Sequence, residues 1–135
     1  QTAEWNAEKA QQIVQSVIDA GDSFNVIYAE NDDMAKGAVA ALDKNNISHG
    51  VDGDVIIMGF DCNKWALKEV LAGNWNYDGQ CNPFQASYID EVIKTLESGG
   101  TVAQKKIILD EKGFDAATIT EEDVNTYGIG SETAE

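Results

Sequence analysis

The stretch from Val55 to Asn63 constrains the fold of this chain more than any other. Val55 to Phe60 form a short apolar run without polar alternation, a pattern typical of a strand that helices cover on both faces. The run ends abruptly at Asp61, and Asn63 is placed to cap a following helix. The stretch therefore predicts a buried strand that presents a carboxylate at its C-terminal end.

The same pattern, a strand that ends in polar residues just before a helix, occurs twice more. Asn25–Ala29 leads into Glu30, Asn31 and Asp32, and Trp75–Cys81 leads into Asn82 and Pro83. A fourth strand is expected at Lys105–Leu109. Strands that alternate with helices predict a parallel sheet with right-handed crossovers. The expected fold is α/β, in three layers (α/β/α), with a mainly parallel sheet.

Apolar residues at helical spacing and capping residues predict the helices between these strands. They are expected from about Ala7 to Ala20 after Asn6, from Asp32 or Asp33 past Leu42, from Asn63 to Gly73, and from Pro83 to Gly99. In the last of these, Asn82 is the expected N-cap, and Tyr88, Ile89, Val92, Ile93 and Leu96 are expected to be buried. Thr120–Asp123 opens a short helix, and Gly128–Glu135 is expected to be a frayed tail.

The net charge of −15, from 9 basic and 24 acidic residues among 135, excludes several partners. Binding to nucleic acid needs clusters of Lys and Arg, and so does binding to an anionic membrane surface. No apolar run reaches the roughly 20 residues that insertion across a membrane needs. Cys62 and Cys81 match no zinc motif, and a disulfide between neighbouring strands or two buried thiols are both compatible with their positions.

Trp5, Asn31, Asp61 and Asn82 are the candidate ligand-binding residues. A carboxylate and two amides can exchange hydrogen bonds with several hydroxyls, and an indole adds an apolar platform. Hydrogen bonds to the charged Asp61 would contribute about 1.5–3 kcal/mol each. In an open α/β sheet, ligands bind at the carboxyl ends of the strands. The set therefore predicts a polyhydroxylated, uncharged ligand.

Each of these residues also has a purely structural interpretation. Asn82 is a good helix cap, Asn31 could shape a turn, Asp61 could cap the strand end, and Trp5 could simply pack. An enzyme is a further alternative, because Asp32, Asp33 and Asp61 resemble the acidic pocket of a phosphoryl-accepting receiver domain with Lys105 as the cation. Lys105 begins a predicted strand instead of ending one, and no phosphate-binding loop or nucleophile elbow occurs. No catalytic residue, metal site or cofactor is expected.

Four segments resemble the C-terminal lobe of type 1 periplasmic sugar-binding proteins, the ribose- and galactofuranose-type receptors of bacterial ABC importers. They are Gln-Thr-Ala-Glu-Trp-Asn (1–6), Tyr-Ala-Glu-Asn-Asp-Asp-Met-Ala-Lys-Gly-Ala (28–38), Gly-Phe-Asp (59–61) and Gln-Cys-Asn-Pro (80–83). The resemblance implies that Trp5 stacks on a sugar ring and that Asn31 and Asp61 bind its hydroxyls. At the position of a glutamine in ribose-type members this chain has Cys81, and Asn82 is expected to take over the role of that glutamine.

The same resemblance implies that this chain is a fragment of an extracytoplasmic, non-enzymatic receptor. Residues 1–115 would be part of the C-terminal sugar-binding lobe, and 116–135 a hinge-crossing segment and tail. An N-terminal lobe and the first strand–helix unit of this lobe would be missing, so that Lys105–Tyr127 lack the surface on which they pack. Partners would be a monosaccharide, the missing lobe and an ABC permease, with self-association through the unpaired sheet edge. The alternative is the effector-binding domain of a LacI-type transcription repressor, which has the same lobes.

Overall fold

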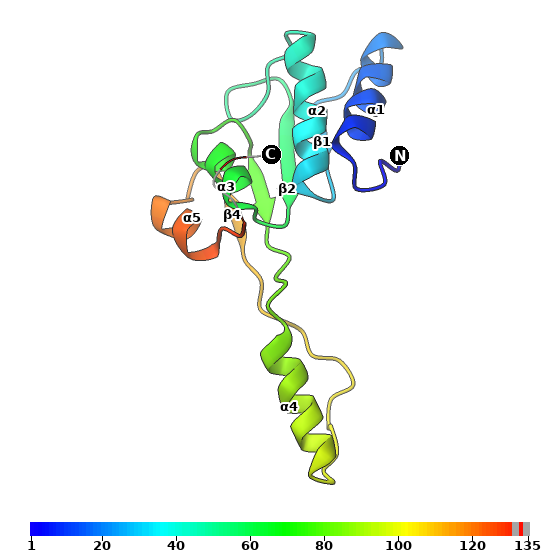
Figure 1. Ribbon diagram of the computed structural model, residues 1–135. Coiled ribbons are helices and arrows are strands. Elements are labelled where there is room, and N and C mark those ends of the chain that lie inside the picture. The colour runs from blue at the N-terminus through cyan, green and yellow to red at the C-terminus, as the bar shows by residue number, and fades with distance from the viewer. Residues whose placement is uncertain (131–132, 134–135) are drawn as a thin grey trace.

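A computed structural model describes residues 1–130 and residue 133, and its four strands form one sheet (Figure 1). The strands are β1 (Val26–Tyr28), β2 (Ile56–Phe60), β3 (Tyr77–Gly79) and β4 (Gly113–Asp115), in the order β1-β2-β3-β4. The β1–β2 and β2–β3 pairs are parallel, and β4 is antiparallel to β3. The predicted α/β class and the mainly parallel sheet are therefore confirmed.

The helices are α1 (Ala7–Asp19), α2 (Asp32–Lys44), α3 (Lys64–Leu71), α4 (Ala86–Glu97) and α5 (Glu121–Tyr127). As predicted, Asn6 caps α1, where its side chain accepts a hydrogen bond from the Lys9 backbone N–H at 2.9 Å. Asn63 stands at the N-cap of α3, but its side chain makes no capping bond there. The short helix opened by Thr120 is present as α5 and has a full capping box.

Only one face of the sheet is covered by helices in the described part of the chain. Ile57 faces α2 and α3 in the core and is fully buried, whereas Val26, Tyr28 and Ile56 on the other face are 46%, 60% and 42% exposed. The strand order β1-β2-β3 never reverses, and right-handed crossovers that advance in one direction place every connecting helix on the same face. The expected second helical layer is therefore not formed by these residues.

The predicted strand at Lys105–Leu109 is wrong, because the fourth strand is β4, eight residues further on. Phe114 in β4 is only 4% exposed and packs with Leu67 and Val124, so the sheet gains a buried aromatic ring from this pairing. Val124 lies in α5, which also contacts α3. The segment 113–127 therefore packs against β3 and α3. Residues 131, 132, 134 and 135 of the expected frayed tail lie outside the described residues.

α4 starts at Ala86 instead of at the predicted Pro83. Asn82 is not its cap: the Asn82 Oδ1 accepts a hydrogen bond from the Phe84 backbone N–H at 2.9 Å and so closes a local turn. Figure 1 shows α4 and the strand-free segment after it extending away from the sheet. The apolar face of α4 is consequently exposed instead of buried, at Tyr88 (43%), Ile89 (55%), Ile93 (48%) and Leu96 (56%).

The two cysteines occupy different environments and are not bonded to each other. Cys62 is fully buried beneath the turn after β2, whereas Cys81 is exposed where the chain leaves the sheet. The expectation of two buried thiols therefore holds only for Cys62. Burial raises the pKa of the Cys62 thiol well above its ordinary value, so this thiol is neutral at physiological pH.

Candidate functional site

The carboxyl ends of β1, β2 and β3 share one edge of the sheet because these strands are parallel. Tyr28 of β1 pairs with Met58 of β2, so Asn31 and Asp61, which follow these two strands, both lie at this edge. On the other side, the Asp61 backbone N–H donates to the Gly79 carbonyl oxygen at 3.0 Å, which brings Gln80 next to Asp61. A carboxamide, a carboxylate and a second carboxamide therefore follow one another along this edge.

Asn31 has a structural role, but as a helix cap instead of the turn residue that the sequence suggested, because its side-chain oxygen caps α2. The Asn31 Oδ1 accepts a hydrogen bond from the Met34 backbone N–H at 2.9 Å, and the residue is 8% exposed. A side-chain amide also carries two N–H donors, and capping uses only the oxygen. Capping therefore fixes the direction of the side chain at the strand end without excluding a ligand.

Asp61 adopts a backbone conformation that L residues rarely take, with φ at +123°, and Cys62 follows with φ at +59°. Such conformations cost of order 1–3 kcal/mol and persist only where the surroundings enforce them. Burial, and then the charge of Asp33, raises the pKa of the half-buried Asp61 carboxyl. A strained, partly desolvated carboxylate at a strand end is better placed to bind a ligand than to serve as a simple cap.

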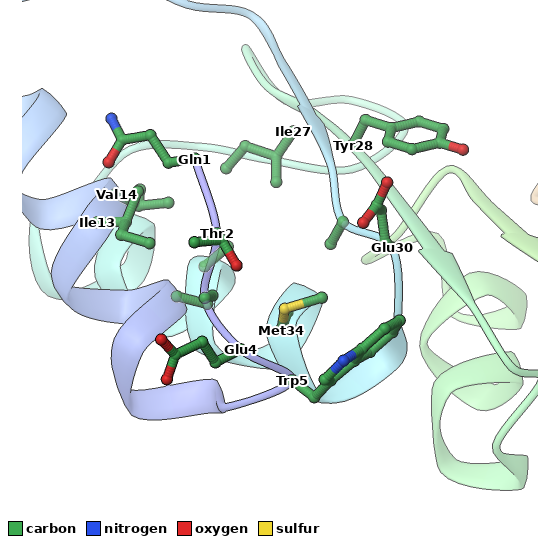
Figure 2. Close-up of a pocket in the computed structure, with 14 residues that line it drawn as sticks. Gln1, Thr2, Glu4, Trp5, Ile13, Val14, Ile27, Tyr28, Glu30 and Met34 are labelled. Carbon is green, nitrogen blue, oxygen red and sulfur yellow. The ribbon is translucent and has the colours of Figure 1, made fainter.

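Trp5 lies on the N-terminal segment at the mouth of a pocket of about 420 Å³. The pocket is bounded by this segment, α1, β1 and the start of α2, and Figure 2 shows the indole next to the loop that follows β1. Glu30 from that loop and Met34 from α2 line the same pocket. Trp5 is 69% exposed, so its indole is not packed in the core of the described residues.

The structure does not place Asn82 at the strand ends with the other candidates. Asn82 lies two residues beyond Gln80, where its backbone N–H donates to Glu111 Oε1 at 2.7 Å and the chain turns toward α4. Gln80 is the residue that directly follows β3, and its Oε1 accepts from the Lys112 backbone N–H at 3.2 Å. Sequence reasoning missed Gln80 because it extended the strand to Cys81, two residues beyond its observed end.

A second feature that the sequence did not reveal lies directly beneath the Asp61 turn. Asp32 and Asp78 are both fully buried, and their carboxyl groups accept hydrogen bonds from the turn. Burial and the neighbouring Asp78 raise the pKa of Asp32 to about 9, and burial raises the pKa of Asp78 to about 7. The pair therefore holds at least one proton at neutral pH.

This burial removes the receiver-domain alternative, which needs an accessible acidic pocket with a lysine. Asp32 is inaccessible, and Lys105 lies on the extension that carries α4 instead of near the strand ends. Within the described residues, no group of three or more His, Cys, Asp or Glu side chains is arranged to hold a metal ion. A search of the same residues for helices long and apolar enough to cross a membrane found none.

Comparison with known proteins identifies the family of this arrangement. Residues 1–101 match the family model described as a periplasmic binding protein domain. The fructose import binding protein FruE of Bifidobacterium longum is 33% identical over 123 residues, which are 90% of this chain and 36% of that protein. A D-apiose import binding protein of Actinobacillus succinogenes is 27% identical over 113 residues, 82% of this chain and 35% of that protein. The chain thus spans about a third of the length of these relatives.

Solved structures show the same fold. A galactofuranose binding protein superposes with a TM-score of 0.82 at 22% identity, covering 94% of this chain and 43% of that one. The arabinose-transporter binding protein of Shewanella sp. ANA-3, solved with L-arabinofuranose, superposes with a TM-score of 0.78 at 22% identity, covering 93% of this chain and 40% of that one. These likenesses confirm the fold expected from the sequence, one lobe of a type 1 periplasmic binding protein.

Proposed function

Because the chain belongs to the family of periplasmic binding protein domains, we propose that it is the C-terminal sugar-binding lobe of a solute receptor that serves an ABC importer. The receptor carries out no reaction: it binds a monosaccharide outside the cytoplasmic membrane, as a free or lipid-anchored protein, and presents it to a permease. The import proteins to which the chain is similar favour this function over the effector domain of a transcription repressor.

The proposal is supported by the positions of Asn31 and Asp61, which follow β1 and β2 where the carboxyl ends of these strands share one edge of the sheet. An amide and a carboxylate side by side can bind two adjacent hydroxyls of one sugar ring, since the carboxylate accepts and the amide both donates and accepts. Trp5, beside the loop that leads to Asn31, offers an aromatic face to the C–H groups of the ring. Gln80 joins the proposed set, and Asn82 becomes a peripheral candidate.

Two exposed apolar surfaces support a second lobe as a partner. The α4 face and the uncovered sheet face, which includes Tyr28 and Ile56, both expose side chains that a larger protein would cover. The relatives are about two and a half times as long as this chain, which leaves room for such a lobe. We propose that the sugar is held between the two lobes and that closure around it is the signal to the permease.

The proposal predicts weak sugar binding by the chain alone. A micromolar receptor binds with about −8 kcal/mol, and an even division between two lobes leaves about −4 kcal/mol, which is near millimolar affinity. Thermal unfolding with D-fructose, D-galactose, D-ribose, L-arabinose and D-apiose tests this. A sugar at about 100 times its dissociation constant stabilises the folded chain by about 2.7 kcal/mol.

Sugars at high concentration also stabilise proteins without binding, so a matched variant is essential. Asp61→Asn removes the charge but keeps the shape, and it should weaken binding about tenfold or more because charged hydrogen bonds are lost. Asp22→Asn is the matched control, because it removes the same charge at an exposed residue. If every sugar of the panel stabilises wild type, Asp61→Asn and Asp22→Asn equally, the proposed function is wrong.

A further inference from the structure

The turn that carries Asp61 rests on two carboxyl groups from different parts of the chain. Asp32 is the first residue of α2, and Asp78 is the central residue of β3. Both are fully buried on the face of the sheet that α2 and α3 cover. They meet over Gly59, where an added Cβ would lie 2.6 Å from the Asp32 Oδ1, so only glycine leaves room for this approach.

One oxygen of each carboxyl group holds the backbone of the turn. The Asp32 Oδ2 accepts from the Asn63 backbone N–H at 2.9 Å and from the Asn63 side-chain Nδ2 at 3.0 Å. The Asp78 Oδ1 accepts from the Cys62 backbone N–H at 3.3 Å. These bonds hold Cys62 and Asn63, the two residues that follow Asp61, and both Asp61 and Cys62 have a positive φ angle. Together with the backbone bonds from Ile129 to the Cys62 carbonyl and from Lys64 to the Ile129 carbonyl, at 2.9 and 2.8 Å, they provide the external support that a strained turn needs.

The other oxygen of each carboxyl group, Asp32 Oδ1 and Asp78 Oδ2, is buried and receives a hydrogen bond from no donor in the described part of the chain. A buried acceptor without a donor costs about 1–3 kcal/mol, and two adjacent buried carboxylates also repel each other. A proton on either carboxyl group removes both problems, because the protonated oxygen becomes a donor to its neighbour. The Asp32 Oδ1 lies against Gly59, and Gly59 pairs with Asp78 of β3, so the two carboxyl groups are neighbours, as this solution requires.

We propose that Asp32 and Asp78 are positioning residues: a proton-sharing carboxyl pair that holds the Asp61–Asn63 turn in its left-handed conformation and thereby aims the Asp61 carboxylate at the ligand. Neither residue touches the ligand. The inference rests on the proposed function for what Asp61 binds, but the pair and its effect on the turn can be measured without any sugar.

The pair makes the turn sensitive to alkaline pH. Burial raises the pKa of both carboxyl groups. Two further titratable groups face the pair: the carboxylate of Asp61 and the thiol of Cys62, and burial raises the pKa of this thiol as well. Loss of the last shared proton leaves two adjacent negative charges close to Asp61. Their repulsion separates the carboxyl groups and releases the bonds to the Cys62 and Asn63 backbone.

Carbon-13 NMR of the side-chain carboxyl carbons, between pH 4 and pH 10, tests the proposal on the 135-residue chain. The Asp32 and Asp78 carbons should titrate together in two steps, with midpoints raised above the ordinary range of aspartate because both groups are buried. The amide signals of Cys62 and Asn63 should shift at the same midpoints. Titration of both carbons below pH 5 would overturn the shared proton, and amide signals that do not follow the carbons would overturn the positioning role.

Asp78→Asn is the conservative variant, since an amide donates to Asp32 permanently and still accepts from the Cys62 N–H. It should abolish one of the two titration steps and keep the wild-type amide positions of the turn to higher pH. Asp22→Asn, an exposed control, should leave both steps unchanged. If the Asp32 carbon titrates at the same midpoint in Asp78→Asn as in wild type, the pair is not coupled and the inference fails. If no sugar of the panel binds specifically, by contrast, the proposed function is wrong, but the result of this carboxyl titration does not change.

Discussion

At the scale of single residues, Asp61 combines an unfavourable backbone angle with a carboxyl group whose pKa burial raises. Neither feature stabilises the fold, and both are typical of positions that serve a ligand. Trp5 likewise has features that do not stabilise the fold: a positive φ of +59° and a side chain that is 69% exposed. Residues of this kind can be tested by variants that change binding without changing stability.

Trp5→Ala is such a variant. Because the indole is largely exposed, we expect the free energy of unfolding to change by no more than about 0.5 kcal/mol, as for other surface substitutions. Sugar-dependent stabilisation should nevertheless be strongly reduced, since the platform for the ring is gone. Urea unfolding with and without sugar measures both quantities. Equal sugar-dependent stabilisation of Trp5→Ala and wild type would remove Trp5 from the site.

The buried carboxyl pair predicts a pH dependence of stability with a definite sign. The pKa values of Asp32 and Asp78 are raised in the folded state, so between about pH 4 and pH 9 the folded chain binds more protons than the unfolded chain. The free energy of unfolding therefore falls as pH rises through this window, with a slope of up to about 1.4 kcal/mol per pH unit for each excess proton.

Urea unfolding at pH 5, 7 and 9 measures this slope, and Asp78→Asn should reduce it while Asp22→Asn should not. A free energy of unfolding that rises from pH 5 to pH 9 would contradict the assignment. Asp115 and Asp123, whose pKa values are lowered by hydrogen bonds from Thr118 and Thr120, act below this window, where stability falls with acidification.

At the scale of elements, the sequence predicted those whose partners are local in the chain. α1, α2, α3 and β1 to β3 follow from apolar periodicity, and Asn6 and Asn31 mark helix starts by capping them. The sequence could not predict β4, because the short Gly113–Asp115 strand is selected by burial of Phe114 against distant residues. For the same reason, the apolar stripe of α4 predicted burial in a core that this part of the chain does not form.

The contrast between α2 and α4 gives an element-scale prediction. Leu42 of α2 is fully buried, and Leu42→Ala should lower the free energy of unfolding by about 2–5 kcal/mol. Leu96 of α4 is 56% exposed, and Leu96→Ala should cost no more than about 0.5 kcal/mol beyond the small helix-propensity difference. Chemical denaturation compares them. A cost of Leu96→Ala similar to that of Leu42→Ala would mean that α4 packs against the lobe in solution.

At the scale of the whole molecule, the site could be predicted only in part. Asn31 and Asp61 could be proposed because strand ends in a parallel sheet converge. Asp78 and Gln80 could not, because they depend on the register and the end of β3, which one sequence does not determine. The strand order in the structure explains why one sheet face is uncovered. The sequence does not give this order, and the continuous apolar run of β2 suggested two covering layers. Ile56, 42% exposed, is where that inference failed.

The uncovered face and the β1 edge predict self-association of this chain. β1 lies at one end of the strand order, with its outer edge unpaired in the described part of the chain, and Val26 and Tyr28 beside it are exposed. Sedimentation should show concentration-dependent dimers that salt promotes, because the net charge of −15 opposes contact between copies. Val26→Lys, a charge on the exposed edge, should weaken the dimer. A monomer at all concentrations and salt levels would contradict this prediction.

The central claim is that Trp5, Asn31 and Asp61 lie close enough together to bind one monosaccharide. The most direct test is a titration of the nitrogen-15-labelled chain with each sugar of the panel, up to about ten times a millimolar dissociation constant. For at least one sugar, the Trp5 indole N–H, the Asn31 side-chain amide and the Asp61 backbone amide should shift together along one common binding curve. If no sugar moves these three signals together, the site does not exist as described.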